Sequence, residues 1–137
     1  MKHEKTIQAS LESIPEITGW VDQLLAMADC TVKARRQIDV ALDEILSNIA
    51  RYAYPDGEGS MTVEIDLDEE TGMLSLTFRD EGVPFDPLAK EEPDVTLDVR
   101  ERAVGGLGIF LVKKMMDEVI YRREGKQNIL RLHKKVK

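Results

Sequence analysis

The sequence lacks the features that stabilise secreted proteins and anchor membrane proteins. Its one cysteine, Cys30, cannot form an internal disulfide, which is typical of a protein in a reducing compartment. No apolar run approaches the roughly 20 residues that a transmembrane helix needs. The N-terminal stretch MKHEKTIQAS contains no hydrophobic signal-peptide segment. These absences predict a cytoplasmic protein that has no membrane partner.

Histidine and net positive charge are also scarce. His3 and His133 lie near the two termini and outside any ligand cluster, so we expect no zinc site. The formal net charge of −7 argues against direct nucleic-acid binding, because such binding needs a basic face to neutralise phosphates. The 137 residues, 42% hydrophobic and 33% charged, suffice for one core. We therefore expect residues 1–137 to form a single domain.

Hydrophobic periodicity predicts the elements of that domain. Ser13 and Glu16 have the spacing of a capping box before the first helix, and Thr31 can cap a second, longer helix. In chain order we expect a strand at 4–10, helices to about 29 and 52, strands at 61–67 and 73–79, a polar connection over 80–104, a helix at about 106–117 and a C-terminal hairpin. Strands in neighbouring hairpins favour an α+β two-layer sandwich, with a mainly antiparallel mixed sheet and helices on one face.

Two polar residues stand on the flank of the apolar stripe of the long helix. Glu44 and Asn48 are i and i+4, so their side chains are neighbours at the rim of the buried face. An Asn oxygen is a suitable neutral ligand for Mg²⁺, and a Glu one turn earlier could orient or deprotonate a nucleophile beside that metal. Taken alone, the pair would more simply be a solvated Glu–Asn pair on a helix flank.

The second motif, DEGVPFDP at 80–87, directly follows a predicted strand. Asp80 at a strand end can point into a cavity and accept a hydrogen bond from an exocyclic amine, which adenine supplies. Gly82 permits a positive φ, and the two prolines stiffen the rest of the segment. By itself this segment could also be a DEG turn on the surface.

The third motif is GGLG at 105–108, which opens an apolar-periodic helix. Glycines let backbone N–H groups approach an anion, and a helix N-terminus adds a favourable dipole. The segment has neither the Lys-Ser/Thr of a P-loop nor the leading strand of a dinucleotide fingerprint, and a tight structural turn is the alternative. We expect the inner face of this helix to carry Leu107, Phe110, Leu111 and Met115.

Together these motifs resemble the GHKL ATP-binding family, named for gyrase, Hsp90, histidine kinases and MutL. Within it, ALDEILSNIARYAYPDGEG, DEGVPFDP and GGLGIFLVKKMMDEV are most similar to the small anti-sigma-factor serine/threonine kinases of bacteria. The similarity covers about residues 37–132. It implies a Bergerat or histidine-kinase-like ATPase fold, with ATP and Mg²⁺ as cofactors.

The resemblance also implies a role for each matching position. Glu44 matches the catalytic base, Asn48 the Mg²⁺ ligand, and Asp80 the carboxylate that reads the adenine amine, with Gly82 allowing close approach of the base. The lid and phosphate-facing helix start match Gly105, Gly106, Leu107 and Gly108. Residues 88–104 would be the ATP lid, in which Arg100 and Arg102 are candidates for phosphate or partner contact.

Two positions depart from the family pattern. Tyr52 stands where relatives often have His, and Lys126, Gln127 and Asn128 stand where a Thr often precedes the last strand. Lys126 or Asn128 could substitute as a polar contact.

The leading hypothesis is a homodimeric kinase that phosphorylates a small anti-sigma-factor antagonist and also sequesters a sigma factor. An ATP-responsive module that clamps a partner without phosphoryl transfer is the main alternative, and a nucleotide-free scaffold is a third. A histidine kinase core is disfavoured because no helical segment with a phosphoacceptor His precedes the motifs.

Overall fold

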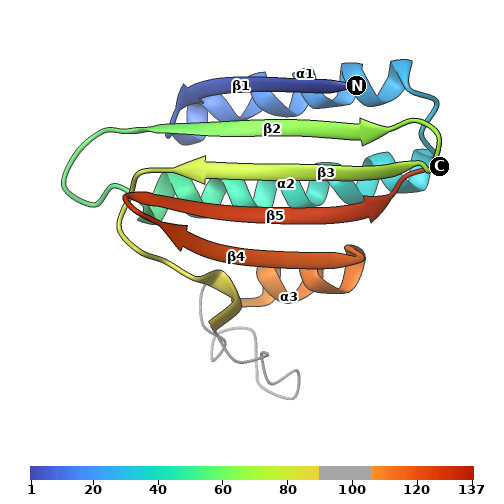
Figure 1. Ribbon diagram of the computed structural model, residues 1–137. Coiled ribbons are helices and arrows are strands. Elements are labelled where there is room, and N and C mark those ends of the chain that lie inside the picture. The colour runs from blue at the N-terminus through green and yellow to red at the C-terminus, as the bar shows by residue number, and fades with distance from the viewer. Residues whose placement is uncertain (90–105) are drawn as a thin grey trace.

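The computed structural model describes residues 1–89 and 106–137, which fold into a sheet with helices on one face (Figure 1). The strands are β1 (Lys2–Gln8), β2 (Ser60–Asp68), β3 (Met73–Asp80), β4 (Glu118–Glu124) and β5 (Gln127–Lys135). The helices are α1 (Ile14–Met27), α2 (Val32–Tyr52) and α3 (Gly106–Met115), and short 3₁₀ turns are η1 (Leu11–Ser13) and η2 (Pro87–Ala89).

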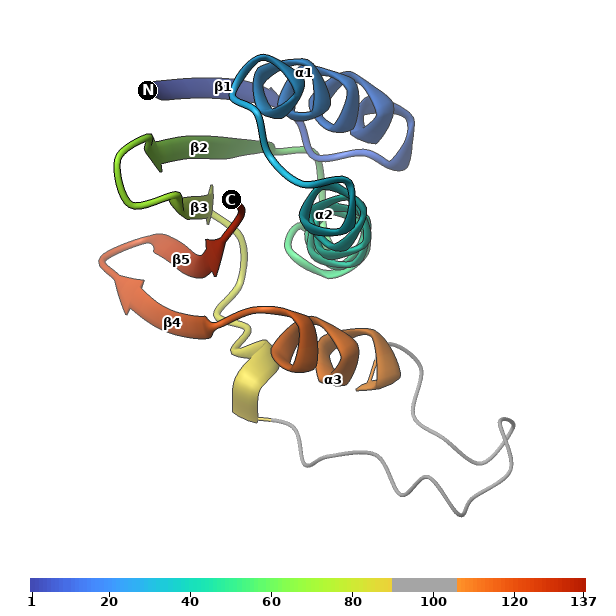
Figure 2. The same ribbon diagram turned by 90° about the vertical axis from the view of Figure 1, so that its right-hand side faces the viewer.

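The five strands follow the order β1-β2-β3-β5-β4, and each described pairing is antiparallel. Viewed along the strands, all three helices cover the same face and leave the other face bare (Figure 2). The α+β two-layer sandwich predicted from the hairpin pattern is thus confirmed. Because β5 lies between β3 and β4, the start of β5 lies beside the end of β3.

Helix α2 begins where the sequence predicts. The Thr31 side chain accepts a hydrogen bond of 3.1 Å from the Ala34 amide, which satisfies one of the free donors of the first turn. Its apolar residues recur at helical spacing and are buried against the sheet: Ile38, Ala41, Leu42, Ile45 and Leu46. This buried stripe fixes the rotation of the helix, so the position of the polar flank beside it is also fixed.

The predicted capping box before α1 is wrong. Ser13 has helical backbone angles (φ −82°, ψ −16°) and no side-chain capping bond, and its hydroxyl instead lies 2.8 Å from that of Ser10. The cause is η1, which runs directly into α1, so Ser13 does not have the extended backbone of an N-cap. Pro15 stands in the first turn, as expected.

Helix α3 presents a different face to the core than its apolar pattern indicated. Ile109 and Val112 are buried, whereas Leu111 is 43% exposed. The segment GLGIFLVKKM is apolar on most of its circumference, so periodicity alone does not select its inner face. None of the helices within the described ranges is long and apolar enough to cross a membrane.

Candidate functional site

A pocket of about 440 Å³, including its open part, lies between the C-terminal half of α2, the end of β3, the start of β5 and the start of α3. Its apolar walls are Ile45, Ile49, Ala53, Phe78, Phe85, Pro87, Ile109 and Leu130. Asn48, Asp80 and Asn128 supply its polar groups, together with the Tyr121 ring and hydroxyl.

The Asp80 carboxylate is the buried acceptor of this pocket. Asp80 is the last residue of β3 and is only 7% exposed. Its Oδ1 accepts hydrogen bonds of 2.9 Å from the Gly82 amide and 2.9 Å from Asn128 Nδ2. The sequence motif that places an Asp at this strand end therefore does place it in a cavity.

Asn128, the second residue of β5, lies directly opposite Asp80 in the β3–β5 register. Its Nδ2 also donates to the Val83 carbonyl at 2.8 Å. Its Oδ1 accepts from the Tyr121 hydroxyl at 2.5 Å and from the Phe85 amide at 3.3 Å. The sequence identified Asn128 only as a replacement at a family position, whereas the structure makes it part of the site; exposed Lys126 lies in the hairpin turn instead.

Gly82 is needed for a reason other than the one its motif indicated. The described residues with positive φ are Asp29, Gly72 and Gly125, so Gly82 does not use the left-handed region. A Cβ at Gly82 would instead overlap the carbonyl oxygen of Ala53, the C-cap residue that follows α2. The next amide, of Val83, donates to that same carbonyl at 2.8 Å. The glycine therefore lets the DEG loop dock on the end of the long helix.

Glu44 lies against the start of α3. A Cβ at Gly108 would overlap Glu44 Oε2, so this turn of α3 passes directly over the carboxylate. Ile109, the next residue, lines the pocket that Asn48 lines one turn further along α2. The structure thus brings Glu44, Asn48, Asp80 and Gly108 to one region.

The remaining predicted site residues stand at or before the start of α3 in the chain. Gly106 and Leu107 form the first turn of α3. Gly105, Arg100 and Arg102 lie outside the described residues, as does most of the predicted lid.

Two tyrosines, Tyr52 and Tyr54, lie at and just after the end of α2. The Tyr52 ring, at the position where relatives often have His, lies 6.0 Å from the Phe85 ring, centroid to centroid. The Tyr54 hydroxyl donates to the Ser60 carbonyl at 2.6 Å and accepts from the Glu81 amide at 2.8 Å. Burial raises the pKa of Tyr54 above its ordinary value.

The arrangement suits a planar base that carries an amine. Apolar walls can enclose the ring, and one buried carboxylate at the end of the pocket can accept from the amine. The Asn48 amide would offer a neutral oxygen to Mg²⁺, which usually takes few protein ligands and completes its shell with phosphates and water. The residues present therefore fit Mg-ATP.

A buried carboxylate at the end of an apolar pocket, beside a long helix and a sheet, is the arrangement of a nucleotide-binding ATPase domain. The chain belongs to the family of histidine kinase-like ATPase domains, whose model matches residues 7–134. This membership confirms the resemblance that the three motifs indicated.

Two curated relatives are similar to this chain over most of its length, and both are named serine-protein kinase RsbW. Serine-protein kinase RsbW of Listeria monocytogenes serovar 1/2a is 31% identical over 108 residues, which are 74% of this chain and 68% of the relative. The protein of the same name from Staphylococcus aureus strain JH9 is 25% identical over 130 residues, 89% of this chain and 80% of that relative.

Solved structures show the same fold. The structure of the RsbU and RsbW domains of a Mycobacterium tuberculosis protein superposes with a TM-score of 0.71 at 13% identity. It covers 99% of this chain, which spans about a third (32%) of the length of that one. A histidine kinase domain from Erythrobacter litoralis gives a TM-score of 0.53 at 18% identity, over 77% of this chain and 46% of that chain.

Proposed function

We propose that residues 1–137 form one ATP-binding kinase domain, a Mg-ATP-dependent serine/threonine kinase that acts as an anti-sigma factor. The observation that carries the proposal is the convergence of three motifs in one region. Asn48 on α2 and Asp80 at the end of β3 line the pocket, and Glu44 on α2 lies against Gly108 at the start of α3. Relatives named serine-protein kinase support the reaction class.

Each group has one task in this proposal. Asp80 accepts from the adenine amine, while the apolar walls hold the ring and exclude water. Asn48 binds Mg²⁺, which when present neutralises charge on the phosphates. The glycines at 105, 106 and 108 let backbone N–H groups and the α3 dipole face the phosphates, with Arg100 and Arg102 as further phosphate or partner contacts.

Glu44 is the proposed catalytic base. It accepts the hydroxyl proton of an acceptor serine as the serine oxygen bonds to the γ-phosphorus and the bond to the β–γ bridging oxygen breaks. Most of the rate acceleration comes from positioning and charge stabilisation. The acceptor is a small anti-sigma-factor antagonist, and a sigma factor is a second partner. The alternative function, an ATP-dependent clamp that transfers no phosphate, uses the same pocket without this step.

The first test is calorimetric titration with ATP, with and without Mg²⁺, followed by transfer of labelled γ-phosphate to a co-encoded antagonist. We expect Mg²⁺ to strengthen binding, Asn48→Ala to remove that gain, and Glu44→Ala to abolish transfer while ATP still binds. The matched control is Asp43→Ala, which removes the exposed carboxylate next to Glu44 on α2 and should keep both ATP binding and phosphoryl transfer. Binding without transfer to any acceptor would favour the clamp, and no binding would refute both functions.

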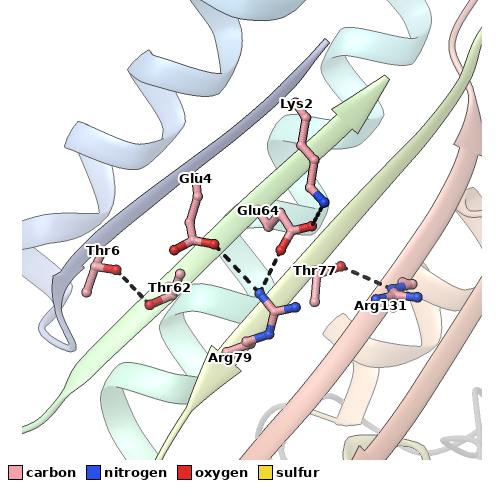
Figure 3. A network of polar contacts seen from close by, with 8 residues as sticks. All are labelled: Lys2, Glu4, Thr6, Thr62, Glu64, Thr77, Arg79 and Arg131. Carbon is pink, nitrogen blue, oxygen red and sulfur yellow. Dashed lines mark hydrogen bonds and ion pairs between the residues drawn. The ribbon is translucent and has the colours of Figure 1, made fainter. Parts of the chain in front are cut away.

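We further propose that the homodimer forms through the bare face of the sheet. Figure 3 shows that the β1–β2 half of this face carries Glu4 and Glu64, the latter 2.7 Å from Arg79. The β4–β5 half carries Arg122 and Arg131, which line a hollow of about 330 Å³ with two isoleucines. Lys2 and Arg79 pair with these carboxylates and Glu124 pairs with Arg122, so much of the charge in each half is neutralised within the chain. In a twofold dimer each acidic half would meet the basic half of the partner, around the exposed Ile120.

This dimer has a direct test. Ile120 in the basic half is 42% exposed, and Ile120→Arg should shift the protein from dimer to monomer in sedimentation. Val40, also 42% exposed but on the helical side, provides the control Val40→Arg, which should stay dimeric. A monomeric native protein, or a dimer that survives Ile120→Arg, would refute this interface and leave the kinase proposal intact.

A further inference from the structure

Buried polar side chains are few in this fold and two of them touch. In the ranges 1–89 and 106–137, the polar or charged side chains in the buried class are Thr77, Asp80 and Asn128. Asp80 and Asn128 are 7% and 6% exposed and share a hydrogen bond at the end of the pocket. Burying two such groups is costly unless their hydrogen bonds are made, so the pair needs an explanation.

The orientation of the Asn128 amide is determined by its neighbours. Its nitrogen faces two acceptors, the Asp80 carboxylate and the Val83 carbonyl. Its oxygen faces two donors, the Tyr121 hydroxyl and the Phe85 amide. A flipped amide would turn its oxygen toward both acceptors and its nitrogen toward the Phe85 amide. Asn128 is therefore held as a donor to Asp80.

This fixed donor controls the carboxylate. Oδ1 of Asp80 receives both Asn128 Nδ2 and the Gly82 amide, which together set the rotation of the carboxylate plane. Since Asn128 offers Asp80 only N–H groups, the carboxylate is used as an acceptor on this side and its orientation in the pocket is fixed. An acceptor at this place suits a purine with an exocyclic amine and leaves a keto oxygen without a donor.

We propose that Asn128 is a positioning residue that makes the pocket select a 6-amino purine over a 6-keto purine, by holding the Asp80 carboxylate as an oriented acceptor. The inference deepens the proposed ATP site and rests on it. Selection by mismatched hydrogen-bonding groups is stronger than selection by shape alone, because the wrong base brings its keto oxygen against the carboxylate, and neither acceptor gains a donor from the other.

The informative variant is Asn128→Asp, which keeps the shape of the side chain and replaces the donor by a second carboxylate. Two carboxylates in contact share a proton, and the protonated member can donate to a keto oxygen. Other ionisable groups near the pair are Tyr121, whose hydroxyl contacts Asn128, and Arg123, which donates to the Gly82 carbonyl at 2.7 Å. Tyr54 and Glu81 complete the set near Asp80. They are unchanged in the variant.

The experiment measures dissociation constants for ATP and for inosine triphosphate, at pH 5.5 and pH 7.5, by titration calorimetry. The two nucleotides differ at position 6, and phosphate titration is common to both, so it cancels in the ratio. We expect the native protein to prefer ATP by at least about tenfold at both pH values. Asn128→Asp should reduce the preference severalfold at pH 7.5 and further at pH 5.5. Gln127→Glu adds the same charge one residue away and should keep the native ratio.

The outcomes separate this inference from the proposed function. If the native protein does not bind ATP, the proposed function fails. If it binds ATP and the ratio in Asn128→Asp is native at both pH values, the positioning role of Asn128 alone is refuted. Thermal unfolding without nucleotide checks the fold of the variant. Should Asn128→Asp fail to fold, Tyr121→Phe removes one donor to the Asn128 oxygen, and it must lower the preference at least about twofold or the inference fails.

Discussion

The contact between Gly108 and Glu44 can be tested by a double-mutant cycle. A methyl group at Gly108 would overlap the end of the Glu44 side chain and no part of the α2 backbone. In an otherwise native protein, Gly108→Ala must therefore displace the carboxylate. In a Glu44→Ala background the space is open, and the same substitution meets no obstacle.

The structure sets the sign and size of each step. Alanine is favoured over glycine inside a helix by up to about 1 kcal/mol, so Gly108→Ala should stabilise the Glu44→Ala protein by a few tenths to about 1 kcal/mol. In the native background, displacing a partly buried carboxylate should offset that gain, giving a change near zero or a loss of about 1 kcal/mol. The coupling free energy should then be about 1 kcal/mol, within the usual range for residues in contact.

Urea denaturation of the four proteins measures this coupling, and phosphoryl transfer gives a second readout. We expect Gly108→Ala to lower phosphoryl transfer, because it displaces the Glu44 carboxylate from its position. The ATP affinity should change little. Equal stability changes in the two backgrounds, within about 0.3 kcal/mol, would show that the two residues do not touch and would refute this geometry.

Three further substitutions test the rest of the structure by chemical denaturation. Gly82→Ala should destabilise the protein by about 1–3 kcal/mol, because its methyl group meets the backbone at the end of α2. The control Gly19→Ala, which has open space around it in α1, should stabilise by up to about 1 kcal/mol. Similar effects of the two substitutions would contradict the docking of the DEG loop. Tyr54→Phe should cost about 0.5–1.5 kcal/mol through two lost hydrogen bonds, and no loss would rule them out. The hydrogen bond from Arg79 lowers the pKa of Glu64 in the folded protein. The ionised Glu64 therefore stabilises the fold at pH values above the ordinary Glu pKa of about 4.3, and this stabilisation is lost as the pH falls through the lower folded pKa. The free energy of unfolding of the native protein should thus exceed that of Glu64→Gln by about 1 kcal/mol at pH 7, and the difference should disappear in acid. A difference that does not depend on pH would show that the Glu64 charge is not its cause.

Local patterns predicted the elements well where one face is clearly apolar. Helix α2 has a regular stripe and a Thr31 cap, and its structure agrees with both. The pattern failed where it was ambiguous: α3 is apolar on most sides, so the exposure of Leu111 depends on which side can approach α2. Gly108, which has no side chain, is what lets that side come close.

Parts of the site could not be predicted because they depend on contacts between distant segments. Asn128 meets Asp80 only through the register of β3 and β5, which joins residues 48 positions apart. Gly82 is required by the Ala53 carbonyl, and no local turn signal reveals that contact. The motifs predicted the Asp and the Gly of the loop, but the partners that explain them come from the tertiary structure.

The two ends of the pocket are held by different kinds of contact, which separates their functions. The Asp80 end is fixed by strand register and by the hydrogen bond that the Val83 amide donates to the Ala53 carbonyl, so changes there should alter which base is bound. The Glu44 end depends on one side chain against one turn of α3, so changes there should alter transfer more than affinity. Asn128→Asp should thus change the choice of nucleotide, and Gly108→Ala should change the fate of the bound nucleotide. If each variant changed both properties equally, the pocket would behave as one cooperative unit and this division would be wrong.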